Sequence, residues 1–515
     1  MQHLVQHTLT RLLVLALPVL LLTDTLSAQT SGQQSGRRTA SILNVVVRVE
    51  AVTQRVAPER PWTIPAIKET KGAGFIVSGN RIITDLELVR GARSITVTSV
   101  STGRRYPARL QFQAFDAGLA VLTVPGDFFQ TQRANLPVTR RSPSIGGRMS
   151  VYGFEAGRNL AVRHLRPRVI ERELLEFSDV DRHFLVFFQN LGGLPLAGYS
   201  GGPALQGGKL VGMFHSGKTD RDRGTYVIPN SVIQHVLTDI RDGRYDGFPL
   251  PVFSYSPAAN QDQRRFLGLE RSIGGIIINR VAFQATVRRA LQPGDVLYQL
   301  NVNPNDRSQW FPVNARGDVI FGQQPRQRRE IMQFLHGLQA GLIKVRAVRG
   351  GKKIERELLL SRNSLFDLRR KRVFSDRKYF LGGGLVFQEL DYELVHEVKH
   401  PSRGVRNRLK YRYNYHLQDL LSEQTDREIV LTGILSDPIN AGTDQYKYSV
   451  VETINGRRVR TLRDFAREWA LNQHRYISIK FLDDPVPLTL EAEYLEQAAT
   501  RIAGKFPLQE MGRVR

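Results

Sequence analysis

Residues 198–203 read Gly198-Tyr199-Ser200-Gly201-Gly202-Pro203. A serine set among glycines is typical of a tight turn that presents a nucleophilic hydroxyl, because glycine lets the backbone bend sharply. A serine hydroxyl is a weak nucleophile until an adjacent base takes its proton. The chemistry of this turn therefore depends on which base the rest of the chain supplies.

The sequence around the turn contains many short β-type runs separated by turn signals. Examples are residues 45–49, 74–77, 94–98 and 119–124. Closely spaced strands without intervening helices predict a β-sandwich or barrel. After residue 229, apolar residues at 232, 233, 236, 237 and 240 share one helical face, so a helix is expected to close this unit near residue 242.

Two later stretches each combine strands with one helix. The first, from about residue 247 to 361, has a strand at 275–279, a helix around 331–338 and a hairpin at 343–351. The second, from about 373 to 490, has strands at 430–435, 450–456 and 476–481 and a helix at 462–469. They are predicted to be related α+β modules, followed by a helical stretch near 493–502.

Composition indicates a folded chain of about three domains, since it has 515 residues, 41% hydrophobic and 23% charged. The sequence has no cysteine, which excludes disulfides and thiolate metal sites. The formal net charge is +25, with basic clusters at 369–372 and 403–412. This charge is either a solvated basic face or a surface for an anionic partner, such as an acidic client, a lipid headgroup layer or a polyanion. Nucleic acid is not expected, since no stripe interleaves aromatic and basic residues.

The N-terminus predicts export. Arg11 precedes an apolar run at 12–22, and small residues end at Ala28, as in a secretory signal peptide. We expect a signal at 1–28, cleaved after Ala28 or retained as an anchor, and a flexible linker at 29–42. The mature protein would then be periplasmic or associated with the cell envelope.

Several motifs, in their order along the chain, resemble the Do-like (Deg/HtrA) serine proteases. They are residues 71–76, 82–84 and 226–229, with Pro61-Trp62 and Gly247-Phe248-Pro249 pointing to the plant-type branch with two divergent PDZ domains. The resemblance implies a mainly β chain. A chymotrypsin-like double β-barrel at 43–246 would precede PDZ-like α+β domains at 247–362 and 363–492 and a helical tail at 493–515.

The resemblance also locates the triad positions, and two of the three depart from the family. The family pattern Thr-Asn-x-His is matched by residues 84–87, so Glu87 stands in place of the histidine. Gly118 stands in place of the aspartate, and Ser200 keeps the nucleophile position. The N–H groups of Gly198 and Ser200 would form the oxyanion hole.

These departures predict weak or absent catalysis. Glutamate has an ordinary pKa near 4.3, so it is a poor base for an alcohol, and glycine cannot orient a base. Asp116 would have to shift by about 6–7 Å, one strand repeat, to replace the missing acid. The remaining histidines of the region, at 164, 183, 215 and 235, are expected to be structural or surface residues.

Two glycine-containing loops resemble the carboxylate-binding loop of PDZ domains. Phe266-Leu267-Gly268-Leu269 is the candidate in the second unit, and residues 381–385 are the candidate in the third. Such loops present N–H groups to a peptide C-terminus while the peptide adds a strand to the sheet. A purely structural turn is the alternative for each.

Three functional hypotheses follow. The first is an exported pseudoprotease that binds unfolded or partner polypeptides as a chaperone or scaffold. The second is an active serine endopeptidase of envelope protein quality control with a non-standard base, such as Glu87 at low pH. The third is a non-catalytic subunit of a hetero-oligomer with an active paralogue. No metal or cofactor is expected, and a homo-oligomer is possible.

Overall fold

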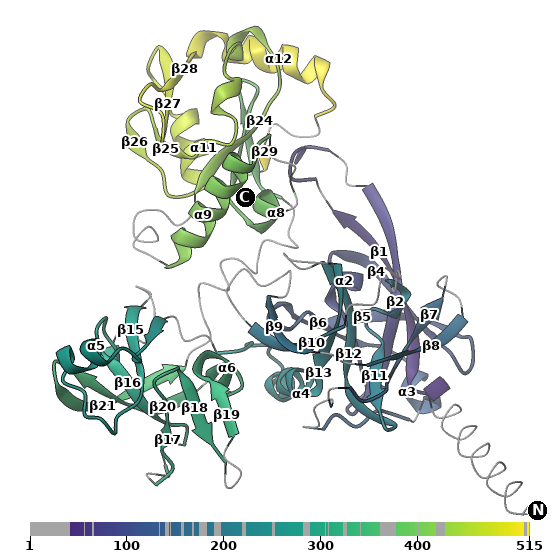
Figure 1. Cartoon of the computed structure of the whole chain (residues 1–515). Helices are drawn as coiled ribbons and strands as arrows, with labels where there is room; N and C mark the ends of the chain where they lie inside the picture. The colour runs from purple at the N-terminus through teal and green to yellow at the C-terminus, as the bar shows by residue number, and fades with distance from the viewer. Residues whose placement is uncertain are drawn as a thin grey trace, which may run out of the picture.

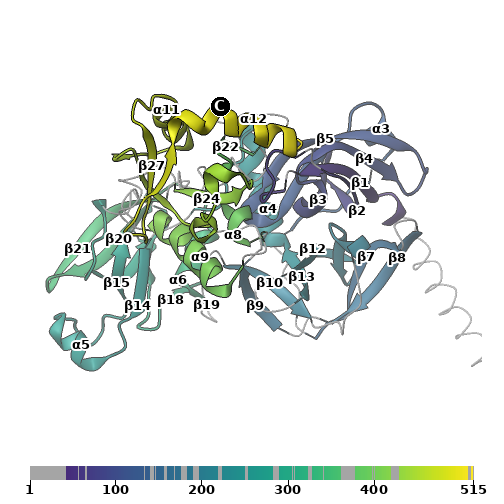
Figure 2. The ribbon, with the colours of Figure 1, turned by 90° about the horizontal axis from the view of Figure 1, so that it is seen from above.

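The computed structural model describes residues 42–508 and 512–513, apart from several short stretches. These are 56, 64–65, 133, 140–143, 145, 156–158, 167–168, 175–182, 190–196, 219–222, 250–252, 282–288, 304, 307, 323–326, 340, 361–376, 397, 399–400 and 419–427. The predicted signal peptide and the basic cluster at 369–372 lie outside the described residues. Figure 1 shows three bodies, which we call the barrel unit, the second unit and the third unit; Figure 2 shows them from above.

The barrel unit begins with a closed six-stranded antiparallel barrel in the order β1-β2-β3-β6-β5-β4. Its strands are β1 (Val46–Arg55), β2 (Ala66–Val77), β3 (Arg81–Asp85), β4 (Ala92–Ser99), β5 (Arg105–Ala114) and β6 (Leu119–Thr123). Two short helices, α2 (Leu86–Val89) and α3 (Phe128–Thr131), follow β3 and β6. Alternating apolar residues such as Val47, Val49 and Ala51 fill the barrel interior, as a half-buried strand requires.

The other half of the barrel unit is a seven-stranded antiparallel sheet in the order β8-β7-β11-β12-β13-β10-β9. Its strands are β7 (Met149–Glu155), β8 (Asn159–Leu165), β9 (Val169–Leu174), β10 (His183–Gln189), β11 (Pro203–Gln206), β12 (Lys209–Lys218) and β13 (Arg223–Pro229). The predicted closing helix is α4 (Asn230–Asp239), with Val232, Ile233 and Val236 buried as expected.

The second unit is built on a sheet in the order β14-β15-β16-β20-β21, with β17 paired to β16. Its strands are β14 (Phe253–Pro257), β15 (Ile276–Val281), β16 (Val296–Asn301), β17 (Phe311–Pro312), β20 (Gly341–Arg349) and β21 (Lys352–Leu360), with a separate hairpin of β18 (Asp318–Phe321) and β19 (Gln327–Glu330). Its helices are α5 (Gln261–Phe266) and α6 (Ile331–His336). The predicted hairpin at 343–351 is β20–β21.

The third unit has two four-stranded sheets, in the orders β24-β23-β22-β29 and β26-β25-β27-β28. The strands are β22 (Tyr379–Gly382), β23 (Leu385–Glu389), β24 (Ile429–Ile434), β25 (Val451–Ile454), β26 (Arg457–Arg458), β27 (Tyr476–Phe481), β28 (Leu488–Glu491) and β29 (Gly512–Arg513). The helices are α8 (Tyr392–His396), α9 (Arg403–Gln418), α11 (Leu462–Ala470) and α12 (Leu495–Lys505). In Figure 1 this unit lies above the barrel unit, and from above it lies in front of the other two (Figure 2).

The fold is mainly β, as predicted, with a double β scaffold followed by α+β units. The domain boundaries proposed from the sequence stay predictions. The basic cluster at 403–412 is part of a helix, α9, which the sequence did not reveal because few apolar residues mark one of its faces. Among the described residues no helix combines the length and apolar character needed to cross a membrane.

Candidate functional site

Ser200 follows a 3₁₀ turn, η2 (Ala197–Tyr199), which is held between the two halves of the barrel unit. A side chain at Gly198 would come within 2.0 Å of the carbonyl oxygen of Phe154, and one at Gly201 within 2.1 Å of that of Ala73. Gly201 also has φ of +84°, a left-handed conformation that favours glycine. The glycines are therefore needed for the close packing of this turn, whatever chemistry Ser200 performs.

Backbone hydrogen bonds join the turn to both halves. The N–H of Ala73, on β2, donates to the carbonyl of Ser200 at 2.9 Å. The N–H of Gly201 donates to the carbonyl of Phe214, on β12, also at 2.9 Å. Ser200 therefore occupies the junction where the active-site cleft of a double-barrel protease would lie.

The residue before the serine is Tyr199, where the family resemblance predicted asparagine. Its ring is buried against Phe214, and its hydroxyl donates to a carboxylate oxygen of Glu155 at 3.2 Å. Burial raises the pKa of Tyr199 above its ordinary value, so the phenol is neutral at physiological pH. The tyrosine extends the packing of the turn onto β7.

The side chain of Ser200 lies against those of Asp85 and His215, and we name these three residues the Asp85–Ser200–His215 cluster. The hydroxyl of Ser200 donates to Oδ2 of Asp85, and Nδ1 of His215 lies 2.7 Å from the same oxygen. The other carboxylate oxygen, Oδ1, accepts the N–H of Glu87 at 3.0 Å. Relative exposures of 0%, 5% and 2% for Asp85, Ser200 and His215 place the whole cluster out of solvent.

Each member comes from a different element. Asp85 ends β3 and is the N-cap of α2, with extended backbone angles of φ −71° and ψ 132°. His215 lies on β12 opposite Tyr226 of β13. A buried carboxylate is stable only when hydrogen-bond donors satisfy it. Because Asp85 belongs to the closed barrel and His215 to the seven-stranded sheet, the bond between them also links the two halves of the barrel unit.

Glu87, the residue at the predicted histidine position, contacts a different partner. Its Oε1 lies 3.8 Å from Nη1 of Arg90, at the end of the same short helix. Its side chain is 36% exposed, in contrast to the buried Asp85. The carboxylate that binds Ser200 is therefore that of Asp85, two residues before the Glu87 that the sequence indicated.

Gly118, the residue at the predicted aspartate position, ends the 3₁₀ turn η1 (Phe115–Ala117). Its φ of +64° and ψ of 20° are left-handed, so an aspartate here would be strained. The carboxylate of nearby Asp116 binds the segment after α4. It accepts a hydrogen bond from the hydroxyl of Tyr245 and another from the N–H of Phe248, the latter at 2.9 Å. Asp116 thus holds the segment that follows α4.

The predicted oxyanion hole stays a prediction. Its donors, the N–H groups of Gly198 and Ser200, belong to the η2 turn or follow it directly. In a 3₁₀ turn, N–H groups donate to carbonyls three residues earlier. Gly198 is the second residue of this turn, so its N–H has no carbonyl three residues earlier within the turn to which it could donate.

The predicted carboxylate-binding loop of the second unit is the C-terminal turn of α5. Phe266 is the last residue of that helix and is 89% exposed. The next three N–H groups, of residues 267–269, donate to carbonyls of α5 at 2.9–3.0 Å, and Gly268 has φ of +66°. This is an ordinary glycine-terminated helix end, and the peptide-binding role of Phe266, Leu267, Gly268 and Leu269 stays a prediction.

The candidate loop of the third unit is the tight turn between β22 and β23. Gly383 and Gly384 have φ of +55° and +78°, and the N–H of Leu435 donates to the carbonyl of Gly384 at 2.7 Å. The strand after the loop, β23, is paired on both sides by β22 and β24. In the second unit β15 is likewise paired on both sides, by β14 and β16. A peptide could add to either strand only by displacing a neighbour.

Sequence reasoning missed Asp85 and assigned His215 to a structural or surface role. The signal for Asp85 was present, because the family pattern has asparagine at this position. The signal for His215 is its spacing: Pro203 pairs with Met213, which brings the residue two positions later alongside the serine turn. His215 is buried and faces the candidate site, so a surface position for it is wrong. Among the described residues there is no group of three His, Cys, Asp or Glu side chains that could hold a metal.

Comparisons with known proteins agree with this architecture. A trypsin-like peptidase domain matches residues 72–213, and a PDZ domain matches residues 370–510. The chain is 23% identical to Protease Do-like 2, chloroplastic, of Arabidopsis thaliana over 92% of this chain and 74% of that protein. It is also 23% identical to Protease Do-like 4, mitochondrial, of the same plant, over 82% and 76%.

Solved structures give a weaker likeness. The HtrA-type protease AlgW with a decapeptide has 17% identity and a TM-score of 0.44, covering 64% of this chain and 98% of that one. The trypsin-like match falls on the barrel unit and the PDZ match on the third unit. A trypsin-like peptidase domain followed by a PDZ domain, together with similarity to Do-like proteases over most of the chain, supports a Deg/HtrA family serine protease.

Proposed function

We propose that the protein is a catalytically impaired Deg/HtrA homologue that binds unfolded or partner polypeptides as a chaperone or scaffold. Export to the periplasm or cell envelope, through the segment at 1–28, belongs to the same proposal. So does association with further copies of the chain.

The observation that carries the proposal is the hydrogen bond from Ser200 to Asp85. The Asp85 carboxylate accepts from Ser200, from His215 and from the N–H of Glu87. Aspartate as a residue type is a weaker base than histidine, which is the usual partner of a nucleophilic serine. The hydroxyl is thereby held by an acceptor that is a poor base.

The architecture supports polypeptide binding. Trypsin-like and PDZ domains both bind extended chains, the PDZ domains by adding a strand to a sheet edge. In the described sheet of the second unit, β14 and β21 are the outer strands. Leu359 of β21 pairs with Leu342 of β20, and the two side chains are 43% and 41% exposed, which gives an extended client an apolar contact.

The test is covalent labelling of the full chain with a fluorophosphonate, together with casein cleavage, from pH 4 to 9. Ser200→Ala is the matched control. We expect no Ser200-dependent labelling or cleavage, and binding of unfolded casein in a fluorescence polarisation assay. Cleavage that Ser200→Ala abolishes would overturn the proposal, as would failure to bind unfolded casein.

A gain-of-function variant sharpens this test. Asp85→Asn and Glu87→His together restore two of the family residues around Ser200 without placing a side chain at the left-handed Gly118. Labelling of this double variant, with silence in the natural chain, would locate the loss of activity at these two positions.

A second candidate function is favoured by the same hydrogen bond. Asp85, rather than the Glu87 named from the sequence, is the carboxylate in a position to accept a proton from Ser200, with His215 orienting it. An active peptidase of this kind would label with fluorophosphonate in the natural chain, and Asp85→Asn would abolish the labelling while Glu87→Gln would not.

A further inference from the structure

The loop between β1 and β2 is a compact structure far from the Ser200 cluster. Hydrogen bonds from the N–H of Arg60 to the carbonyl of Ala57, and from the N–H of Thr63 to the carbonyl of Arg60, both 3.0 Å, form two successive turns over residues 57–63. Pro58 and Trp62 are buried, although they lie at the tip of a hairpin. Something outside the barrel therefore covers them.

The covering surface is the third unit. Trp62 is 8% exposed and packs in one apolar cluster with residues of β22, β23, α12 and the segment after β24. They are Tyr379, Leu381, Val386, Leu435, Ala498 and Ile502. We call this set the indole pocket. In Figure 1 the purple loop at the end of β1 reaches toward the third unit, near β29.

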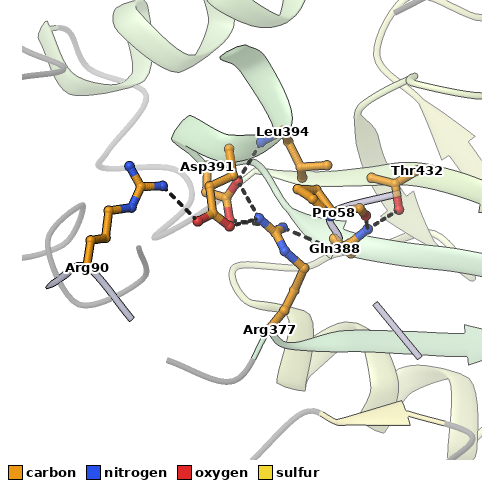
Figure 3. Close-up of polar contacts among 8 residues, drawn as sticks. Pro58, Arg90, Arg377, Gln388, Asp391, Leu394 and Thr432 are labelled. Carbon is orange, nitrogen blue, oxygen red and sulfur yellow. Dashed lines mark hydrogen bonds and ion pairs between the residues drawn. The ribbon is translucent and has the colours of Figure 1, made fainter. Parts of the chain in front are cut away.

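A buried amide of the third unit binds the same loop. The side-chain amide of Gln388, on β23, donates to the carbonyl of Pro58 at 2.8 Å (Figure 3). Gln388 is fully buried, and its other groups are fixed by Arg377, which donates to it at 3.0 Å, and by Thr432 at 2.5 Å. An amide that is oriented in advance recognises a backbone carbonyl at low entropic cost.

A second barrel residue joins this interface through charge. Arg90, which follows α2, is 2% exposed, and its Nη2 lies 3.4 Å from Oε1 of Glu393 on α8. Glu393 in turn binds Arg377 at 2.6 Å, and Asp391 binds Arg377 at 3.1 Å (Figure 3). The interface therefore has an apolar part, a hydrogen-bonded part and an ionic part.

We propose that the third unit is a receptor for the barrel's own loop, and that its ligand is the turn-forming Pro-x-x-x-Trp segment at 57–63. The indole pocket takes the tryptophan, Gln388 reads the carbonyl of Pro58, and Glu393 binds the neighbouring Arg90. This site uses β22, β23 and α12, and it does not use strand addition beside the glycine loop. The PDZ domain of this chain thus binds in cis a segment of the barrel instead of a free C-terminus.

The first test uses a fluorescent peptide of residues 55–65 and the full chain. In the natural chain the pocket is occupied, whereas Trp62→Ala vacates it. We expect the peptide to bind Trp62→Ala at least tenfold more tightly than the natural chain, and a peptide with alanine in place of the tryptophan to lose that binding. Trp310→Ala is the matched control, because Trp310 stacks on Arg346 inside the second unit. Equal binding to the natural chain and Trp62→Ala would overturn the proposal.

Hydrogen exchange gives a second readout that does not depend on peptide affinity. Trp62→Ala should speed amide exchange at least tenfold in residues 379–389 and 86–90, and Trp310→Ala should leave both segments unchanged. Unchanged rates in a folded Trp62→Ala chain would also overturn the proposal. Peptide binding by the natural chain that increases on dilution would assign the loop to a second copy and overturn binding in cis.

Discussion

Two buried polar networks in this molecule differ in how they share charge. In the Asp85–Ser200–His215 cluster the single carboxylate of Asp85 is bonded to three groups. In the interface between the barrel and third units, Arg377 is shared among Gln388, Asp391 and Glu393, and Glu393 is shared with Arg90. The cluster depends on a single residue, whereas the interface spreads its charge over several.

The difference predicts how each network fails. Removing the Asp85 carboxylate takes a hydrogen-bond acceptor from three donors at once. Removing one acid from the interface leaves Arg377 with other acceptors. Buried polar groups that lose their partner cost far more than those that keep an alternative, so substitutions in the cluster should have the larger effects.

The largest effect is expected for Asp85→Ala. It removes the partner of Ser200 and His215 and the N-cap of α2, and we expect a loss of about 3–5 kcal/mol. Urea unfolding followed by hydrogen exchange in β3 and β12 would measure it.

Asp127→Ala is the matched control for this loss. Asp127 pairs with Arg104 at 3.0 Å on the surface, and such pairs contribute about 0–1 kcal/mol. Equal losses for the two variants would contradict the structural role given to Asp85.

Glu393→Gln should have an intermediate effect. The amide keeps the shape of the side chain and one acceptor but loses its charge toward Arg90 and Arg377. Hydrogen bonds to charged groups contribute about 1.5–3 kcal/mol, and the remaining bond from Arg377 to Asp391 should keep the loss toward the lower end of that range. Urea unfolding would measure the loss, and hydrogen exchange in 86–90 and 379–389 would locate it. A loss larger than that of Asp85→Ala would reverse the comparison between the networks.

Ser200→Ala should cost less, about 1 kcal/mol, because Asp85 keeps two of its three donors. A loss of stability would distinguish Ser200 from a serine that serves catalysis alone, because replacing such a serine need not lower the free energy of unfolding. Thermal unfolding of the two chains would show it as a lowered midpoint. A midpoint equal to or above that of the natural chain would show that the serine hydroxyl contributes no stability.

The smallest effect concerns pH and a contact between the barrel unit and the second unit. His235, on α4, stacks on Phe248, and its Nδ1 lies 3.2 Å from the amide of Gln339 in the second unit. Burial lowers the pKa of His235 below 6.5. The unfolded chain therefore takes up the proton first, so this contribution to stability is present above pH 6.5 and is lost as pH falls toward the lower folded value. His235→Gln should flatten the pH dependence of the unfolding free energy in that window, and an unchanged slope would contradict it.

Local patterns predicted the local parts of the fold. Alternation predicted the strands that became β4 and β6, and the helical face at 232–240 predicted α4. The C-terminal part of α5 was interpreted as a loop, although Asn260 caps the helix by accepting the N–H groups of Asp262 and Gln263. The strong glycine signal at 268 marked where that helix ends.

The site could be predicted only in part. The motif placed Ser200 in its turn, but the bond to Asp85 depends on how two sheets pack, and no periodicity contains that information. The contact of Trp62 with the third unit is still more remote. Trp62 and the third-unit residues that cover it are separated by several hundred positions in the sequence. Nothing in the local sequence of the β1–β2 loop indicates what covers Trp62.

That separation has a consequence for how the chain is made. Gln388 lies 330 residues after Pro58, to which it donates a hydrogen bond. At a synthesis rate of about 5–20 residues per second, the barrel loop waits roughly 15–65 seconds on the ribosome before Gln388 is synthesised. During that interval the indole of Trp62 and the guanidinium of Arg90, both buried in the folded chain, stay exposed, which would make the nascent barrel a client for holding chaperones.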